Sequence, residues 1–229
     1  MLKKTLLLTL TICAAASLSI SQPAYAQISE FKITAADGAE RDNFGGSVSI
    51  SGDYAVLGAP FDDDNGLSSG SAYVFKRSGT SWVEEAKITA SDGAPDDQFG
   101  GSVSISGDSV AVVGAWSDDD KGSKSGSAYV FKRAGTSWAQ EAKLLPSDGA
   151  ADDHFGFLVS ISGDYAVVGA SSNDDNGPES GSAYVFKRTG TSWAQEAKLL
   201  PSDGAAEDHF GASVSISGGY VVVGAWLAD

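Results

Sequence analysis

The sequence contains a single cysteine, Cys13, among its 229 residues. Cys13 lies in an N-terminal segment that we expect to be removed, so the remaining chain has no disulfide and no thiol for catalysis. Without a disulfide framework, the stability of the fold must come from the packing of apolar side chains.

Basic residues are also scarce, with 15 Lys and Arg against 30 Asp and Glu and a formal net charge of −15. Without Lys3 and Lys4 of the N-terminal segment, the excess of acid is larger still. A surface of this sign repels nucleic acid and anionic membranes. The composition therefore excludes nucleic-acid binding and leaves cations, basic proteins and neutral ligands such as sugars.

Long apolar runs are absent except at the start of the chain. Lys3 and Lys4 precede an apolar run over residues 6–20, and Ala24-Tyr25-Ala26 follows it. This order is typical of a secretory signal peptide, here residues 1–26, cleaved before Gln27. No other stretch reaches the roughly 20 apolar residues of a membrane span. We expect an exported protein, secreted or held at the cell surface or in the periplasm, with no membrane insertion.

What the chain has in abundance is repetition. A Phe-Gly pair occurs at Phe44, Phe99, Phe155 and Phe210, in steps of 55, 56 and 55 residues, and a Gly-Ala pair follows each of the four. A fixed step of this length predicts a repeat architecture. The complete repeats are residues 44–98, 99–154 and 155–209, and residues 27–43 and 210–229 form partial units of the 27–229 domain.

Each repeat contains four segments with the period-two alternation of β-strands, separated by turn residues; in the second repeat they are residues 99–106, 109–115, 127–133 and 137–144. Four antiparallel strands repeated around an axis describe a blade of a β-propeller. We therefore predict an all-β protein, a β-propeller with about 3.5 to 4 blades. The second repeat has one extra residue after Gly107, which predicts a bulge or a longer turn there.

The partial units leave the closure of the ring open. Residues 27–35 align with a fourth strand, and residues 210–229 supply only the first two strands of another blade. The two could combine into one split blade, which would still lack its third strand. The alternatives are an incomplete propeller that forms a homodimer and a piece of a larger propeller.

Three short motifs carry a family resemblance. Phe44-Gly45, Gly58-Ala59-Pro60 and the segment from Gly70 to Phe75 resemble an FG-GAP repeat, the unit of the β-propeller in integrin alpha subunits and in many bacterial exported proteins. The resemblance implies a β-propeller that binds proteins or glycans. The calcium loop of integrin-type repeats, D-x-D-x-D-G between the first and second strands, has no counterpart here, because that place holds only pairs such as Gly52-Asp53.

Runs of acidic residues lie instead between the second and third strands of each repeat. If they bind Ca²⁺, the candidate metal ligands are Asp62, Asp64, Asp118, Asp120, Asn173 and Asp175. Their glycine falls one place too early for an EF-hand-like loop, and no distal glutamate follows. The alternative is a solvated turn, for which Asp, Asn and Gly are the usual residues.

A second acidic motif precedes each Phe-Gly pair and connects one blade to the next. In a four-stranded blade this connection lies on the same side as the loop between strands two and three, so we expect one negatively charged face. Asp97, Asp153 and Asp208 of this motif, together with Trp116 and Trp226 at the proline position of Gly-Ala-Pro, are the candidate ligand-binding residues. Solubility alone is the alternative explanation of the surface acid.

Three further tryptophans, Trp82, Trp138 and Trp193, recur at the start of the outer strand and are expected to pack between blades. His154 and His209 occupy a position that holds Asn43 and Gln98 in the other repeats, which favours a polar contact over catalysis. No residue pattern indicates an enzyme. We expect a non-enzymatic binding or adhesion module for protein or glycan partners; the alternatives are a scaffold within a larger surface protein or hydrolase and a calcium-dependent structural protein.

Overall fold

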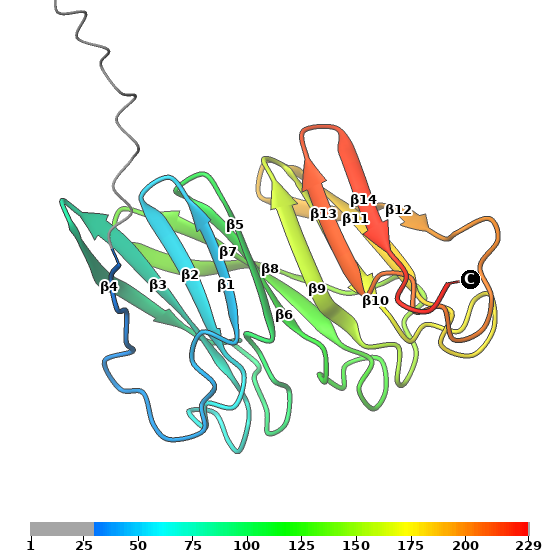
Figure 1. The fold of residues 1–229 in the computed structure, drawn as a ribbon, viewed down its shortest axis with the longest axis horizontal. Coiled ribbons are helices and arrows are strands. Elements are labelled where there is room, and N and C mark those ends of the chain that lie inside the picture. Colours follow the sequence, from blue (N-terminus) through cyan, green and yellow to red (C-terminus); the bar gives the residue numbers. More distant parts are fainter. Residues whose placement is uncertain (1–29, 229) are drawn as a thin grey trace, which may run out of the picture. The chain divides into compact units, whose positions relative to one another are not determined.

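The structure is a computed structural model that describes residues 30–228, all of whose regular elements are β-strands (Figure 1). The expected signal peptide lies outside the described residues. The strands of the first two repeats are β1 (Ser47–Ser51), β2 (Tyr54–Ala59), β3 (Ser71–Ser78), β4 (Ser81–Ile88), β5 (Ser102–Ser106), β6 (Val110–Ala115), β7 (Ser127–Ala134) and β8 (Ser137–Leu144). The others are β9 (Phe155–Ser162), β10 (Tyr165–Ala170), β11 (Ser182–Thr189), β12 (Ser192–Leu199), β13 (Ser213–Ser217) and β14 (Tyr220–Gly224).

The strands form three antiparallel sheets of four strands each, β1–β4, β5–β8 and β9–β12, followed by the two-stranded sheet β13–β14. Within each sheet the strands lie in chain order, as in a propeller blade. Residues 30–43 form no strand and pair with neither β13 nor β14. The fold is therefore an incomplete β-propeller, and the split blade that would close a four-bladed ring is not formed in the described chain.

The first two strands of each sheet are joined by a tight hairpin. Ser51 pairs with Tyr54 across Gly52-Asp53, and Gly52 has the positive φ of 58° that such a turn requires. In the second sheet Ser106 pairs with Val110, so the extra residue lengthens the turn and the β5–β6 register is unbroken. Of the two expected outcomes, the longer turn is confirmed.

A bulge interrupts the outer pair of every four-stranded sheet. Val74 pairs with Ala86 and Phe75 with Glu84, which leaves Glu85 between them without a partner strand residue. The side chain of Glu85 bonds the Arg133 guanidinium at 2.7 Å and the Trp138 indole at 3.2 Å in the second sheet. The equivalent Glu141 bonds Arg188 and Trp193 in the third sheet. The bulge therefore links neighbouring sheets, and the expected inter-blade packing of Trp138 and Trp193 is confirmed.

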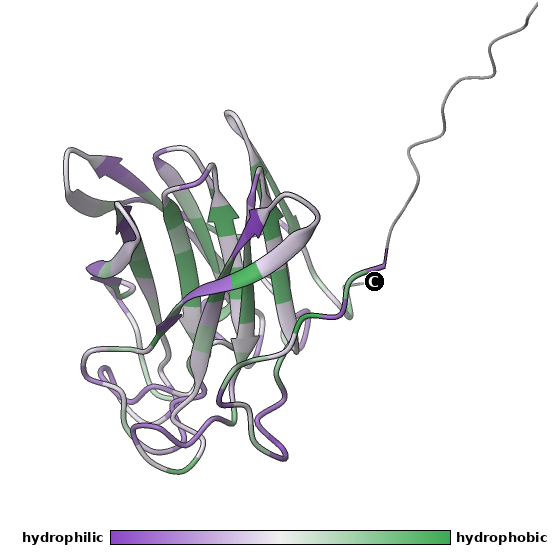
Figure 2. Cartoon of the chain, turned by 90° about the vertical axis from the view of Figure 1, so that its left-hand side faces the viewer, coloured by the Kyte–Doolittle hydropathy of each residue, from purple (hydrophilic) through white to green (hydrophobic). Residues whose placement is uncertain are grey.

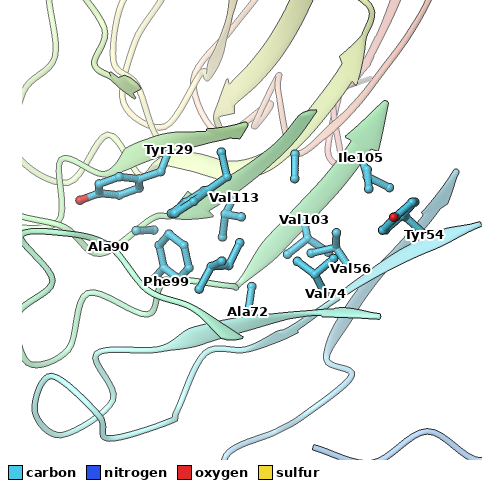
Figure 3. Close-up of a cluster of buried hydrophobic side chains, with 14 residues drawn as sticks. Tyr54, Val56, Ala72, Val74, Ala90, Phe99, Val103, Ile105, Val113 and Tyr129 are labelled. Atoms are coloured by element: carbon cyan, nitrogen blue, oxygen red, sulfur yellow. The ribbon is translucent and has the colours of Figure 1, made fainter. Parts of the chain in front are cut away.

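The core lies between successive sheets. Val56, Ala72 and Val74 of the first sheet pack in one cluster with Phe99 and Val113 of the second repeat (Figure 3). Phe99 contacts the Tyr129 ring edge-on at a centroid distance of 5.4 Å, as Phe155 contacts Tyr184 in the next sheet. Small and β-branched residues in β2, β6 and β10 are almost fully buried because they are covered on both faces.

The two dipeptides that mark the repeat meet at these junctions. A Cβ atom on Gly58 would lie 1.9 Å from the carbonyl oxygen of Gly100, and Gly169 stands in the same relation to Gly211 at 2.0 Å. No side chain fits into that space. The glycine of Phe-Gly in one sheet therefore requires the glycine of Gly-Ala in the sheet before it.

Serine hydroxyls connect the innermost strands across each junction. Ser47 and Ser49 of β1 accept hydrogen bonds from the amides of Val103 and Ile105 in β5, at 2.9 and 3.1 Å. The same pattern recurs between β5 and β9 and between β9 and β13. Serine at alternate positions of β1, β5 and β9 therefore satisfies amides of the following sheet, which gives the recurring serines a structural role.

The long loops of each repeat lie together at one end of the sheets. The β2–β3 loop bonds the β4–β5 connection, with Gln98 donating its amide to the Ser68 carbonyl at 3.1 Å and Phe99 to Ser69 at 3.0 Å. The expectation that both families of acidic loops share one face is confirmed. Figure 2 shows hydrophobic bands across the middle of the strands and hydrophilic residues in the loops.

Candidate binding face

Each four-stranded sheet carries a lysine that reaches from its fourth strand into the acidic loops. In the first sheet the Lys87 ammonium lies 2.8 Å from Asp37, 3.0 Å from Asp62 and 2.6 Å from Asp64. The Tyr73 hydroxyl, with one proton to donate, lies within hydrogen-bond distance of both Asp37 and Asp62, and the ammonium lies over the Tyr73 ring, 5.2 Å from its centroid. We call this group of three carboxylates, one tyrosine and one lysine the lysine node.

The second and third sheets repeat the lysine node. Lys143 contacts Asp92 at 2.9 Å, Asp118 at 3.0 Å and Asp120 at 2.5 Å. Lys198 contacts Asp148 at 2.7 Å and also Asp175, while an asparagine takes the place of the buried aspartate. A lysine node ties the loop entering the sheet, the β2–β3 type loop and the fourth strand to one another.

The pKa values follow from this geometry. Burial alone would lower the pKa of Lys87, but its hydrogen bonds to Asp37, Asp64 and Asp62 outweigh burial and raise the pKa above its ordinary value. The hydrogen bond from Lys87 in turn lowers the pKa of Asp37. Burial raises the pKa of Tyr73 as well, so the tyrosine keeps its proton and remains a hydrogen-bond donor. A lysine node is therefore an ionised cluster with a protonated tyrosine.

Five of the six residues predicted as metal ligands belong to these clusters, and the sixth, Asn173, accepts the Asp175 amide of the third cluster. Asp62, Asp118 and Asn173 are buried and accept hydrogen bonds from the hydroxyls of Ser71, Ser127 and Ser182. Asp64, Asp120 and Asp175 bind the lysines. Within residues 30–228 no three or more His, Cys, Asp or Glu side chains form a group suited to a metal ion. These residues do not fit Ca²⁺, because an ammonium group already occupies the centre that the cation would take.

The acidic residues before each Phe-Gly pair stabilise their own turns. Asp97 accepts the Ala94 amide at 2.7 Å, Asp153 accepts Ala150 at 2.8 Å and Asp208 accepts Ala205 at 2.8 Å. Asp97 and Asp153 are buried, so their carboxylates face the turn and not a ligand in solvent. Burial raises the pKa of Asp97 to about 6. Asp208 is half-buried.

The two candidate tryptophans belong to one aromatic row at the loop end of the sheets. Trp116, at the end of β6, lies 6.4 Å from Phe157 at the start of β9, and Phe157 lies 5.7 Å from Trp226 after β14 (ring centroids). Trp226 is 63% exposed. Three successive sheets thus contribute one ring each, and we call these three residues the aromatic row.

Two histidines border the aromatic row. His154 contacts the Trp116 ring edge-on at 5.0 Å and bonds the Ser172 hydroxyl through Nδ1. His209 lies 6.2 Å from Trp226 and donates from Nδ1 to the Ser171 carbonyl. Burial lowers the pKa of His154, which keeps its ring neutral near pH 7. The histidines support the aromatic rings and the loops around them.

Sequence reasoning missed Phe157 and the lysines. Phe157 stands where the other repeats have Gly46, Gly101 and Ala212, so a departure from the repeat was the available signal. Lys87, Lys143 and Lys198 recur at one position of the fourth strand of each repeat, with no local signal of a contact to the loops. Their reach to the loops depends on the bulge, which turns the strand after Glu85, Glu141 or Glu196.

The sequence matches the model of one protein family along nearly its whole length. The model of the FG-GAP repeat matches four times, over residues 29–75, 82–131, 138–186 and 193–229. The chain belongs to the FG-GAP repeat family. The second and third FG-GAP units each span two sheets, because they start in the fourth strand of one sheet and end in the third strand of the next. The fourth unit ends after β14.

Individual proteins resemble this chain much less than the family model does. No curated protein matches the sequence. Among solved structures, Sqt1 of Saccharomyces cerevisiae is similar at a TM-score of 0.45 and 10% identity, over 73% of this chain and 38% of that protein. The chain therefore spans well under half the length of this structure. Residues 30–228 include no helix of the length and apolarity needed to cross a membrane.

Proposed function

We propose that this FG-GAP protein is an exported, non-enzymatic binding module whose ligand docks on the aromatic row. The observation that carries the proposal is the row itself. Trp116, Phe157 and Trp226 come from three different sheets at positions where the repeat otherwise has Pro, Ser, Gly or Ala. The core between sheets does not need these rings, because the first repeat has Pro60 at the position of Trp116 and Trp226, and Gly46 at that of Phe157.

The chemistry of the row favours a partner with a flat apolar surface and polar edges. Aromatic side chains supply large contact area at small cost in side-chain entropy, and tryptophan and tyrosine are enriched where binding energy concentrates. A sugar ring stacked on the exposed indole of Trp226, or an apolar anchor of a protein, fits this surface. The acidic loops around it disfavour anionic ligands and attract basic proteins.

The lysine nodes give the binding face a rigid base. Each of them holds two loops to one strand, so the loops that surround the row are fixed before a ligand arrives. Preorganised loops bind with a smaller loss of conformational entropy. Residues in the nodes are therefore support for the binding face and are not expected to contact the ligand.

Binding should be measured on arrays of immobilised neutral oligosaccharides, with a parallel arm of basic extracellular proteins. Trp116→Ala and Trp226→Ala should each weaken binding at least tenfold in the arm that binds the native protein. Val83→Ala is the matched control, because Val83 is exposed on β4 near the opposite end of its sheet. Equal binding by the native protein and the Trp226→Ala variant would refute the role of the row.

A further inference from the structure

The first and last sheets each expose a surface that is buried at every junction inside the chain. Val48 and Ile50 of β1 are both 66% exposed, whereas their equivalents in β5, β9 and β13 are between 5% and 9% exposed. Gly45 belongs to the same surface: a Cβ there would meet nothing within 4 Å, while one on Gly100 would lie 2.2 Å from a carbonyl oxygen. We call Gly45, Val48 and Ile50 the leading face.

The other end of the chain shows the complementary surface. Val222 of β14 is 70% exposed, whereas its equivalents Val56, Val112 and Val167 are fully buried. Tyr220 is 83% exposed, and the serines of β13 are exposed as well. A Cβ on Gly224 would meet only Ser213 of its own sheet, at 3.3 Å. The trailing face consists of Ser213, Ser215, Ser217, Tyr220, Val222 and Gly224.

These two faces are the halves of an interface that the chain already makes three times. At the first junction, Tyr54 and Val56 of β2 pack in one cluster with Val103 and Ile105 of β5, and Ser47 and Ser49 accept the amides of β5. By the equivalence of the repeats, Tyr220 and Val222 of one copy would pack against Val48 and Ile50 of another copy. Ser213 and Ser215 would accept hydrogen bonds from the amides of Val48 and Ile50.

The widths of the two faces also agree. The outer part of the first sheet, around Tyr73 and Phe75, is already covered by Ile33 and Ala35 of the N-terminal segment. Within residues 30–228, the inner strand β1 is the part of this side of the sheet that remains exposed. The last sheet has only the two inner strands β13 and β14. A two-stranded trailing face therefore suffices to cover the part of the first sheet that is open.

We propose that two copies of this chain associate head to tail, the trailing face of each docking on the leading face of the other, to close one ring. Propellers contain 4 to 8 blades. The described residues of one copy contribute four innermost strands, β1, β5, β9 and β13, so two copies give eight, whereas three would exceed the range. Both contacts in such a ring are heterologous, and the ring uses up both exposed faces.

The first test is the mass of the purified full chain by sedimentation equilibrium over a concentration series. The native protein should reach twice the chain mass. Val48→Asp and Val222→Asp should each shift the midpoint of association to at least tenfold higher concentration, because each places a carboxylate in an apolar contact. Val83→Asp, a charge at an exposed site outside both faces, should behave as native.

Mixing the two variants distinguishes this arrangement from a symmetric dimer. Val48→Asp retains an intact trailing face and Val222→Asp an intact leading face, so the mixture should regain one contact and form a heterodimer. A face-to-face dimer would show no such rescue. Gly224→Ala offers a variant that leaves the monomer nearly unchanged and should still weaken association, since the equivalent glycines meet a carbonyl oxygen within about 2 Å.

A native chain that remains monomeric at all concentrations would overturn the proposal. The two faces would then be covered by additional repeats of a larger propeller. A dimer unaffected by Val48→Asp and Val222→Asp would overturn it as well. The mass measurement does not involve the aromatic row, so a failure here is distinct from a failure of the proposed binding function.

Discussion

The close backbone approach between neighbouring sheets predicts a large difference between two chemically identical substitutions. Gly169→Ala would place a Cβ 2.0 Å from the Gly211 carbonyl oxygen, whereas Gly224→Ala, at the equivalent position of the last sheet, would place one 3.3 Å from the Ser213 Cβ. To accommodate a Cβ at position 169, the third and fourth sheets would have to separate by more than about 1 Å. The Cβ would meet backbone atoms, so no flexible side chain could move away instead.

The expected cost of Gly169→Ala is about 3 kcal/mol of unfolding free energy, the upper end for over-packed sites. Gly224→Ala should cost less than about 0.5 kcal/mol, as for most surface changes. In urea, the first variant should lower the unfolding midpoint by about 1 M or more and the second hardly at all. Tryptophan fluorescence reports the transition, at a chain concentration where the midpoint no longer depends on concentration.

Equal midpoints for Gly169→Ala and Gly224→Ala would refute the reasoning. That result would mean that neighbouring sheets slide freely past one another. The close approach between sheets would then not require the glycines of Phe-Gly and Gly-Ala. Gly58→Ala and Gly114→Ala should resemble Gly169→Ala, because their Cβ atoms would meet carbonyl oxygens at 1.9 and 2.0 Å.

Three further predictions concern charges. Glu141→Ala removes the partner of the half-buried Arg188 guanidinium and should cost about 2 kcal/mol in urea unfolding, whereas Glu196→Ala, an exposed equivalent 3.7 Å from Lys187, should cost less than about 0.5 kcal/mol. Chelator should leave the melting temperature of the native protein unchanged, while Lys143→Gln, which frees three carboxylates, should melt at a temperature that rises with added Ca²⁺. Asp97→Asn should make the protein more stable at pH 7 by up to about 3 kcal/mol.

The sign of the Asp97 effect follows from its pKa, which burial raises to about 6 in the folded protein from 3.8. The folded state therefore holds this proton more tightly, and the contribution of Asp97 to stability falls as pH rises from about 4 to 6. Asparagine keeps the acceptor for the Ala94 amide and removes the buried charge. Unfolding curves of both proteins at pH 4 and pH 7 give the comparison; an Asp97→Asn variant with the native pH dependence would contradict the assignment.

Most of the fold could be predicted from the repeat itself. Period-two alternation, the Gly-Asp turn and the recurring Trp138 and Trp193 define four strands and the contact between sheets, because these signals act within a few residues. The bulge at Glu141 could not be predicted, since only the Arg188 and Trp193 partners in the next sheet explain why the strand skips a residue.

The candidate site was less predictable for the same reason. The acidic runs suggested a cation, and an ammonium group lies among them, supplied by a lysine 25 residues further along the chain. The tryptophans were visible as departures from Gly-Ala-Pro, but their connection through Phe157 depends on three sheets meeting at one end. Contacts between repeats follow from the arrangement of the sheets and leave little trace in any single repeat.

The second, third and fourth FG-GAP units each begin in one sheet and continue into the next, so every boundary between the described sheets is crossed by a continuous unit. Duplication or loss of a whole unit of about 55 residues would therefore reproduce junctions that already exist and would introduce no new kind of contact. Array length can change by recombination without redesign of any neighbour, whereas a cut at a sheet boundary would separate a glutamate from its arginine.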